Sequence, residues 1–260
     1  MVAALAGAAA AQPVSREELD ELLARVVVTD SRAFETTLEG DLGFPPGSAA
    51  LLGSFTDSIY SSADFQTYLL ARIEEVDRAV VLQSIGEFAA AARTEAYRDG
   101  TLRLPPSGLL AFVDHIHEIL TWLAATDPAL CAVVAREPAA VLDDAEIELE
   151  YFAQISPEEL RSTLRYRTAA ITAETSQAPP WHAFSRAELA AGRAALAQAQ
   201  TEATTLPPPL IAACSAVSVC VPPPTEDQAR CRRSLLQLEA FGALAEPERS
   251  WAIAAFIVDL

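Results

Sequence analysis

The sequence contains no lysine and only three histidines, and this scarcity excludes several kinds of chemistry. Without lysine the chain can form neither a Schiff base nor the phosphate contact of a P-loop lysine. It also has no Gly-x-Gly-x-x-Gly, His-Glu-x-x-His or Gly-x-Ser-x-Gly motif. The usual signatures of dinucleotide-binding proteins, zinc proteases and serine hydrolases are therefore missing.

Every basic residue is an arginine, and the formal net charge is −18. Binding to nucleic acid phosphates requires a clustered basic surface, and the densest cluster here is Arg230, Arg232 and Arg233. The acidic balance argues against a nucleic-acid partner and fits a partner with a basic face, or a need for solubility. The alanine-rich, lysine-free composition indicates a GC-rich bacterial genome.

The N-terminal residues 2 to 11 are small and apolar, and Ala9-x-Ala11 before Gln12-Pro13 has the form of a signal-peptidase site. The basic region that precedes such a run is missing, so we interpret 1–11 as the distal end of a secretory signal. The alternative is the alanine-rich tail of a cytoplasmic protein. We predict a periplasmic or extracellular protein, with no membrane span once the signal is removed.

The four cysteines are Cys131, Cys214, Cys220 and Cys231, and none lies in a Cys-x-x-Cys unit. An even number in an exported protein predicts two disulfides. Cys220 and Cys231 flank the proline tract 222–224 between two helices, so we expect them to pair, and Cys131 then pairs with Cys214 by elimination. In a cytoplasmic protein all four would be buried thiols.

Helix-start signals recur along the chain, while strand signals are nearly absent. Ser15 and Glu18 form a capping box, and Ser156-Pro157-Glu158-Glu159 combines an N-cap, an N1 proline and an N3 glutamate. Only residues 210–221 resemble a strand, and no repeat of fixed period occurs. We predict an all-α fold, an irregular bundle of about nine or ten helices that is not a solenoid.

The proline tracts at 207–209 and 222–224 indicate how the chain is divided. After the signal segment 1–11, we expect a main helical domain over 12–206. Residues 207–260 would form a helical subdomain that packs on the first and is held by disulfides.

The stretch 108–125 is the most apolar long run inside the chain, and we expect it to be the central helix. At about 100° per residue its large apolar side chains fall in one stripe. These are Leu109, Phe112, Val113, Ile116, Ile119, Leu120 and Leu123.

The same helix carries two histidines, His115 and His117, which point in nearly opposite directions because they are two residues apart. They cannot hold one metal ion together, although His115 with Glu118 and Asp114 with His117 remain as weaker pairs. His182 is the only other histidine. We expect both helix histidines to border the core and bond to a carboxylate or carbonyl.

Each of two charged segments can be interpreted either as a binding site or as an ordinary structural feature. The acidic run 143–150 lacks the glycine of a calcium loop, so we expect a solvated helix face. Arg161 and Arg165 share a helix face near Arg167 and are candidate anion contacts, but pairing with Glu158 is the favoured interpretation.

These patterns together predict a protein that works by binding a protein partner or an apolar ligand between its helices, without catalysis, cofactor or metal ion. One alternative is a metal-dependent or acid–base enzyme that uses His115, Glu118 and His182. Another is a plain apolar carrier with a large internal cavity.

Overall fold

The computed structural model describes residues 14–28, 38–45, 47–73, 84–136, 138–142, 144–205 and 225–260. Within these ranges the chain forms twelve helices, one of them a 3₁₀ helix, and no strand. The predicted all-α class is confirmed, and the number of helices is slightly higher than expected. The signal segment 1–11 and the segment 210–221 lie outside the described residues, as does the predicted domain boundary at 206/207.

The helices follow one another in a simple order along the chain. The first are α1 (Arg16–Val28), α3 (Ser48–Tyr60), α4 (Ala63–Ile73), α6 (Ile85–Thr101), α7 (Pro106–Thr126) and α8 (Pro128–Val134). The 3₁₀ helix η1 (Pro138–Leu142) precedes α9 (Ala145–Phe152), α10 (Pro157–Thr175), α11 (Arg186–Thr205), α12 (Glu226–Ala243) and α13 (Glu248–Val258).

Helix α10 begins where its capping sequence predicts. The Ser156 hydroxyl accepts a hydrogen bond from the Glu159 backbone N–H at 3.3 Å, and the Glu159 carboxylate accepts one from the Ser156 N–H at 2.8 Å. The two contacts satisfy two N–H groups that a helix start leaves without a partner. Asp127 caps α8 in a related way, through the N–H groups of Ala129 and Leu130.

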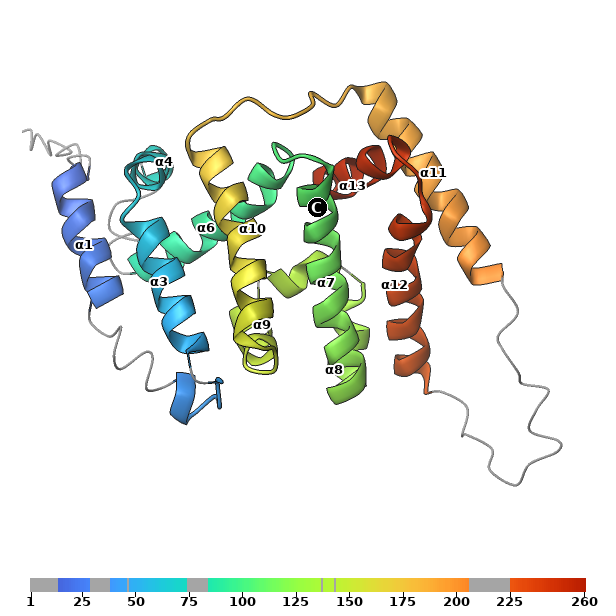
Figure 1. Ribbon diagram of the computed structural model, residues 1–260, viewed down its shortest axis with the longest axis horizontal. Helices are drawn as coiled ribbons and strands as arrows, with labels where there is room; N and C mark the ends of the chain where they lie inside the picture. The colour runs from blue at the N-terminus through green and yellow to red at the C-terminus, as the bar shows by residue number, and fades with distance from the viewer. Residues whose placement is uncertain are drawn as a thin grey trace, which may run out of the picture.

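Helix α7 is the central helix, as predicted. It contacts α12, α13 and α8 on one side and α10, α6 and α9 on the other, and Figure 1 shows it between α10 and α12. All seven residues of its predicted apolar stripe are buried. Each large side chain of this kind contributes about 1.5–3 kcal/mol when it leaves water, so α7 holds the two halves of the fold together.

Two glycines allow helices to cross at short distance. A Cβ atom on Gly100 of α6 would lie 1.9 Å from the Ala170 carbonyl oxygen of α10. A Cβ atom on Gly192 of α11 would lie 2.3 Å from the Trp251 carbonyl carbon of α13. Any larger residue would push these helix pairs apart, because backbone atoms cannot move out of the way as a flexible side chain can.

The disulfide in the described chain joins Cys131 of α8 to Cys231 of α12, with a Cα–Cα distance of 5.5 Å. The predicted pairing of Cys220 with Cys231 and of Cys131 with Cys214 is therefore wrong. The prediction relied on proximity in sequence, whereas α8 and α12 pack side by side across 100 residues of chain. Cys214 and Cys220 lie outside the described residues.

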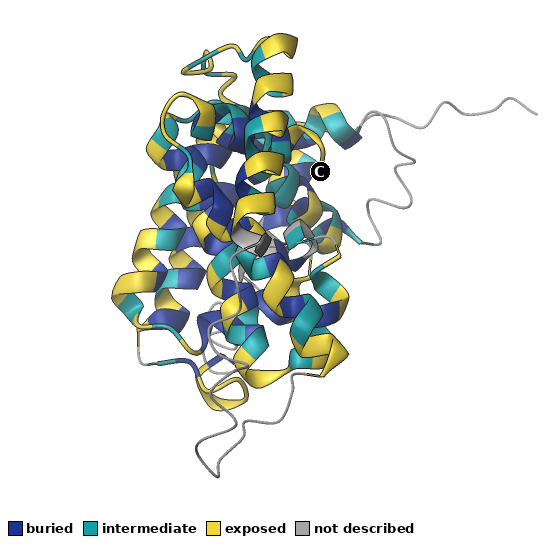
Figure 2. Ribbon diagram, turned by 90° about the vertical axis from the view of Figure 1, so that its right-hand side faces the viewer, coloured by how far each residue is buried: buried dark blue, intermediate teal, exposed yellow. Residues whose placement is uncertain are grey.

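Buried residues lie on the helix faces that meet inside the fold, and exposed residues lie on the outer faces (Figure 2). None of the helices in the described ranges has both the length and the apolar character that crossing a bilayer requires.

Candidate functional site: a cleft along helix α7

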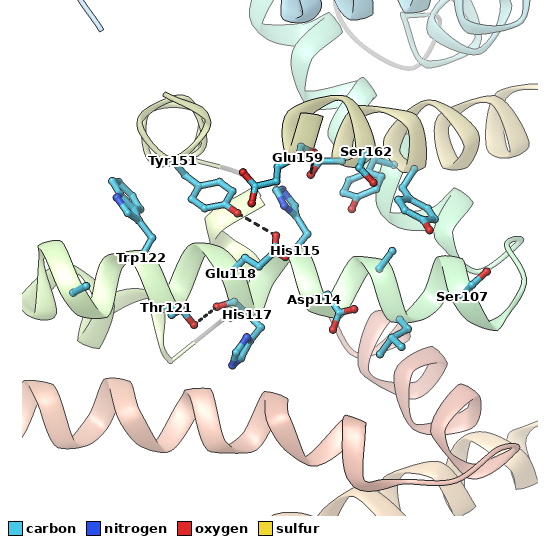
Figure 3. Close-up of a pocket in the computed structure, with 16 residues that line it drawn as sticks. Ser107, Asp114, His115, His117, Glu118, Thr121, Trp122, Tyr151, Glu159 and Ser162 are labelled. Carbon is cyan, nitrogen blue, oxygen red and sulfur yellow. Dashed lines mark hydrogen bonds between the residues drawn. The ribbon is translucent and has the colours of Figure 1, made fainter. Parts of the chain in front are cut away.

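A cleft of about 860 Å³ runs along α7, beneath α9 and α10, with one residue contributed by α6 (Figure 3). Its volume lies within the range of small-molecule sites. The lining residues are Tyr97, Ser107, Leu110, Ala111, Asp114, His115, His117, Glu118, Thr121, Trp122, Ala125, Tyr151, Glu159, Ser162, Thr163 and Tyr166.

The α7 side of the cleft arises from helical spacing. Ser107, Ala111, Asp114 and Glu118 recur every three or four residues and therefore lie on one face of the helix. In Figure 3 Trp122 stands near one end of this face and Ser107 near the other, with Asp114 and Glu118 between them. One edge of the core helix is thus polar and open.

A buried ionic cluster lies behind the cleft and joins α7, α9 and α10. The Glu148 carboxylate of α9 accepts a hydrogen bond from the Arg167 guanidinium of α10, and the same oxygen lies 3.4 Å from Nε2 of His115. The three residues are only 8%, 2% and 3% exposed, respectively. Burial alone would raise the pKa of Glu148, but the Arg167 and His115 contacts outweigh it and lower the pKa to about 2.

Aromatic rings enclose this cluster. The His115 ring stacks on Phe152 with centroids 5.8 Å apart, and the Arg167 guanidinium lies 4.9 Å from the centre of the Tyr97 ring. Such contacts hold a planar cation or imidazole in one orientation. These rings therefore help to fix the orientation of the His115 imidazole and the Arg167 guanidinium.

Two nitrogens of this cluster, Nδ1 of His115 and Nε of Arg167, have no hydrogen-bond partner among the described residues. Nδ1 of His115 is buried and makes no hydrogen bond with any described residue, although His115 also lines the cleft. In the neutral imidazole the proton resides on Nε2, because only an N–H group can bond to the Glu148 carboxylate. Nδ1 is then a hydrogen-bond acceptor that no described residue uses.

The carboxylates on the cleft face of α7 differ in their contacts. Glu118 accepts a hydrogen bond from the Tyr151 hydroxyl at 3.0 Å (Figure 3). Asp114 makes no hydrogen bond or ion pair with the described residues. Partial burial of its carboxyl group and the nearby negative charge of Glu118 raise the pKa of Asp114.

His115 bonds to a carboxylate, as expected, whereas the expected bond of His117 is not found, and the three residues of the enzyme alternative do not meet. His117 Nε2 lies 3.5 Å from Glu239 of α12, without hydrogen-bond geometry. His182 bonds to Glu188 at 3.0 Å, in the connection to α11 and apart from the cleft. Of the three residues in the enzyme alternative, only His115 and Glu118 line the cleft.

The described residues include no group of three or more His, Cys, Asp or Glu side chains that could hold a metal ion. At the His182 contact, hydrogen bonds from the Ser185 backbone and side chain and from His182 lower the pKa of Glu188 to about 2. These groups satisfy one another at the start of α11.

The predicted anion contacts, Arg161 and Arg165, are exposed on α10. Neither forms an ion pair with a described residue, so the expected pairing with Glu158 is not found. The Arg165 guanidinium instead lies 5.6 Å from the centre of the Tyr166 ring. The third arginine of this group, Arg167, is the one that is neutralised inside the protein.

Sequence reasoning missed the burial of Glu148, because it assigned the acidic run 143–150 to a solvated helix face, and it did not identify Glu148 as the partner of Arg167. Glu146 and Glu150 of the acidic run are indeed exposed, but Glu148 is buried, so the predicted fully wet face is wrong at that position. A signal was available, since each charge shares its helix face with apolar residues. Arg167 follows Leu160 and Leu164 at helical spacing and precedes Ile171, and Glu148 lies beside Ile147 and is followed by Tyr151 and Phe152.

No family model, curated protein or solved structure matches this chain. The functional interpretation therefore depends on the geometry of the cleft.

Proposed function

We propose that the protein is an exported binding protein that takes up a small, partly apolar molecule in the cleft along α7 and performs no chemistry of its own. The observation that carries this proposal is the cleft itself, with about 860 Å³ of space beside the central helix of the fold. Within it Leu110, Ala111 and Trp122 offer apolar surface next to the polar groups of α7. This mixture is typical of small-molecule sites and favours a ligand over a large protein partner.

The rigid surroundings support binding. The cleft is bounded by α7, α9 and α10, and the Glu148–Arg167 ion pair joins α9 to α10 behind it. A site that is already formed loses little conformational entropy when the ligand arrives. We also propose that the helices form one irregular bundle around α7, with no solenoid repeat.

Export is supported by the bond between Cys131 and Cys231, because disulfides persist mainly in oxidising compartments. If the protein is periplasmic or secreted, the mature chain from its native host begins after Ala11. N-terminal sequencing of that chain tests this part of the proposal. A start at Met1 in a cytoplasmic fraction would contradict it.

The binding proposal is tested by filling the cleft. We expect Ala111→Trp to abolish the binding of small molecules that co-purify with the native protein, as measured by native mass spectrometry, because the indole occupies the space beside Leu110. The matched control is Ala194→Trp on an exposed face of α11. Equal retention by both variants, or a native protein that carries no small molecule and binds none in a metabolite screen, would refute the proposal.

A second candidate function is acid–base catalysis on a molecule held in the cleft. The contact between Glu148 and His115 favours it, since a buried carboxylate that orients a histidine is a common arrangement for a general base. In this candidate His182 has no part. The test is turnover of a panel of ester and amide substrates by the wild-type protein and by His115→Gln, and equal rates for the two would exclude it.

A further inference from the structure

Among the polar side chains that line the cleft, three from α7 carry hydrogen-bond acceptors, while the hydroxyl groups of serine, threonine and tyrosine can both donate and accept. Asp114 and Glu118 present carboxylates from α7, and His115, whose side chain is almost fully buried, also lines the cleft and has an Nδ1 atom without a partner among the described residues. Glu118 uses Oε2 for the Tyr151 hydroxyl, so its Oε1 has no donor among the described residues. No arginine is among the residues that line this cleft. A ligand that satisfies these groups must donate hydrogen bonds.

The charge of the cleft is also uncompensated. The basic residues whose electrostatic effect reaches Asp114 are His117 and Arg249. Arg249 donates to the Leu244 carbonyl at 2.8 Å, and Nε2 of His117 lies 3.5 Å from Glu239 without a hydrogen bond. The two α7 carboxylates therefore lie close together without a bound counter-charge, which favours a cationic ligand.

Aromatic rings lie beside these carboxylates. Trp122 and Tyr151 form a tilted pair with centroids 6.1 Å apart, and both line the cleft. Tyr166 and Leu110 add further apolar surface. Rings next to carboxylates bind organic cations well, since the ring face attracts the charge and also packs against hydrocarbon.

We propose that the cleft binds an organic ammonium ion that carries N–H groups and an apolar tail. The N–H groups donate to the carboxylates of Asp114 and Glu118 and to Nδ1 of His115, and the tail packs against Trp122 and Tyr151. This inference rests on the proposed binding function and names the class of ligand.

The experiment is isothermal titration calorimetry on the full chain with four probes of similar shape. Phenethylammonium carries charge and N–H groups, and its N-trimethyl derivative carries the charge alone. 2-Phenylethanol is neutral, and phenylacetate is an anion. We expect phenethylammonium to bind about tenfold more tightly than 2-phenylethanol and at least about threefold more tightly than the trimethyl probe, with phenylacetate weakest.

The carboxylates are tested with the double variant Asp114→Asn/Glu118→Gln. It should lower the affinity for phenethylammonium to the level of 2-phenylethanol and leave the affinity for 2-phenylethanol unchanged. The matched control is Glu226→Gln/Asp227→Asn, which removes the same charge from exposed positions of α12 outside the cleft. The control should bind all four probes as the wild type does.

The outcomes separate the two proposals. If 2-phenylethanol or phenylacetate binds as tightly as phenethylammonium, and Ala111→Trp blocks this binding, the ammonium ion is the wrong class and the binding function stands. Equal affinity for the trimethyl probe refutes the donation of N–H groups to the carboxylates and to His115 Nδ1. If none of the four probes binds, the ammonium inference fails, and the metabolite screen described above then decides the binding function.

Discussion

The buried pair of Glu148 and Arg167 is the interaction whose loss should cost the most stability for the smallest chemical change. Glu148→Gln keeps the shape of the side chain but removes its charge. Arg167, which is 2% exposed, is then left with its positive charge in the core. Breaking one side of a buried ion pair typically costs about 3–5 kcal/mol, because the other charge remains without a partner.

The pKa of Glu148 gives a second value for the stability that its contacts contribute. A fall from 4.5 to about 2 on folding corresponds to roughly 3 kcal/mol of stability at neutral pH. The sign follows from the direction of the shift. Because the folded pKa lies below the unfolded one, the contribution is complete above about pH 5 and is lost as the pH falls towards 2.

The assay is urea unfolding of the disulfide-intact protein at several pH values. We expect Glu148→Gln to lower the free energy of unfolding by about 3 kcal/mol at pH 7, and the difference from wild type should shrink between pH 5 and pH 2. The matched control is Glu226→Gln, which removes an exposed i,i+4 partner of Arg230 and should cost less than about 0.5 kcal/mol.

A double variant distinguishes the ion pair from general damage to packing. Glu148→Gln combined with Arg167→Met removes both charges, so it should recover a large part of the loss seen with Glu148→Gln alone. The reasoning is refuted if Glu148→Gln unfolds within about 0.5 kcal/mol of wild type, or if its deficit is the same at pH 7 and pH 2.

Two further predictions concern packing and the disulfide. Gly192→Ala should lower the free energy of unfolding by about 1–3 kcal/mol, because the new methyl group meets the Trp251 backbone. Gly242 has nothing within 4 Å of a new Cβ atom, so Gly242→Ala should leave the free energy of unfolding unchanged or raise it slightly. Urea unfolding measures both variants, and equal effects would contradict the close crossing of α11 and α13. Replacing Cys131 and Cys231 by alanine should lower the free energy of unfolding by roughly 4 kcal/mol, because their disulfide closes a loop of 100 residues. Peptide mapping of the wild-type protein without reduction should recover the two cysteines in one disulfide-linked peptide pair.

Much of the helical structure could be predicted because its signals are local. The capping box of Ser156 and Glu159 operates within one turn, and the apolar stripe of α7 follows from helical spacing alone. The boundaries of α3, α8 and α12 follow in the same way from flanking turn and proline signals. These features depend on residues a few positions apart, so they do not depend on how the helices are arranged in space.

The site was only partly predictable. His115 and Glu118 share a helix with i,i+3 spacing, so their common position on the cleft could be foreseen, and His182 was included only as the remaining histidine. The partner of His115 could not be foreseen, because Glu148 is 33 residues away and Arg167 a further 19. Glu148 was expected on a solvated helix face.

The amino-acid sequence by itself determined the all-α class, the central helix and the absence of several catalytic motifs, because composition and short-range periodicity act before any tertiary contact forms. The packing of α7, α9 and α10 decided which charges became buried, and the packing of α8 against α12 decided which cysteines met. The physical reason is that pairing across long stretches of chain depends on helix positions in space, and these come from the sum of many apolar contacts.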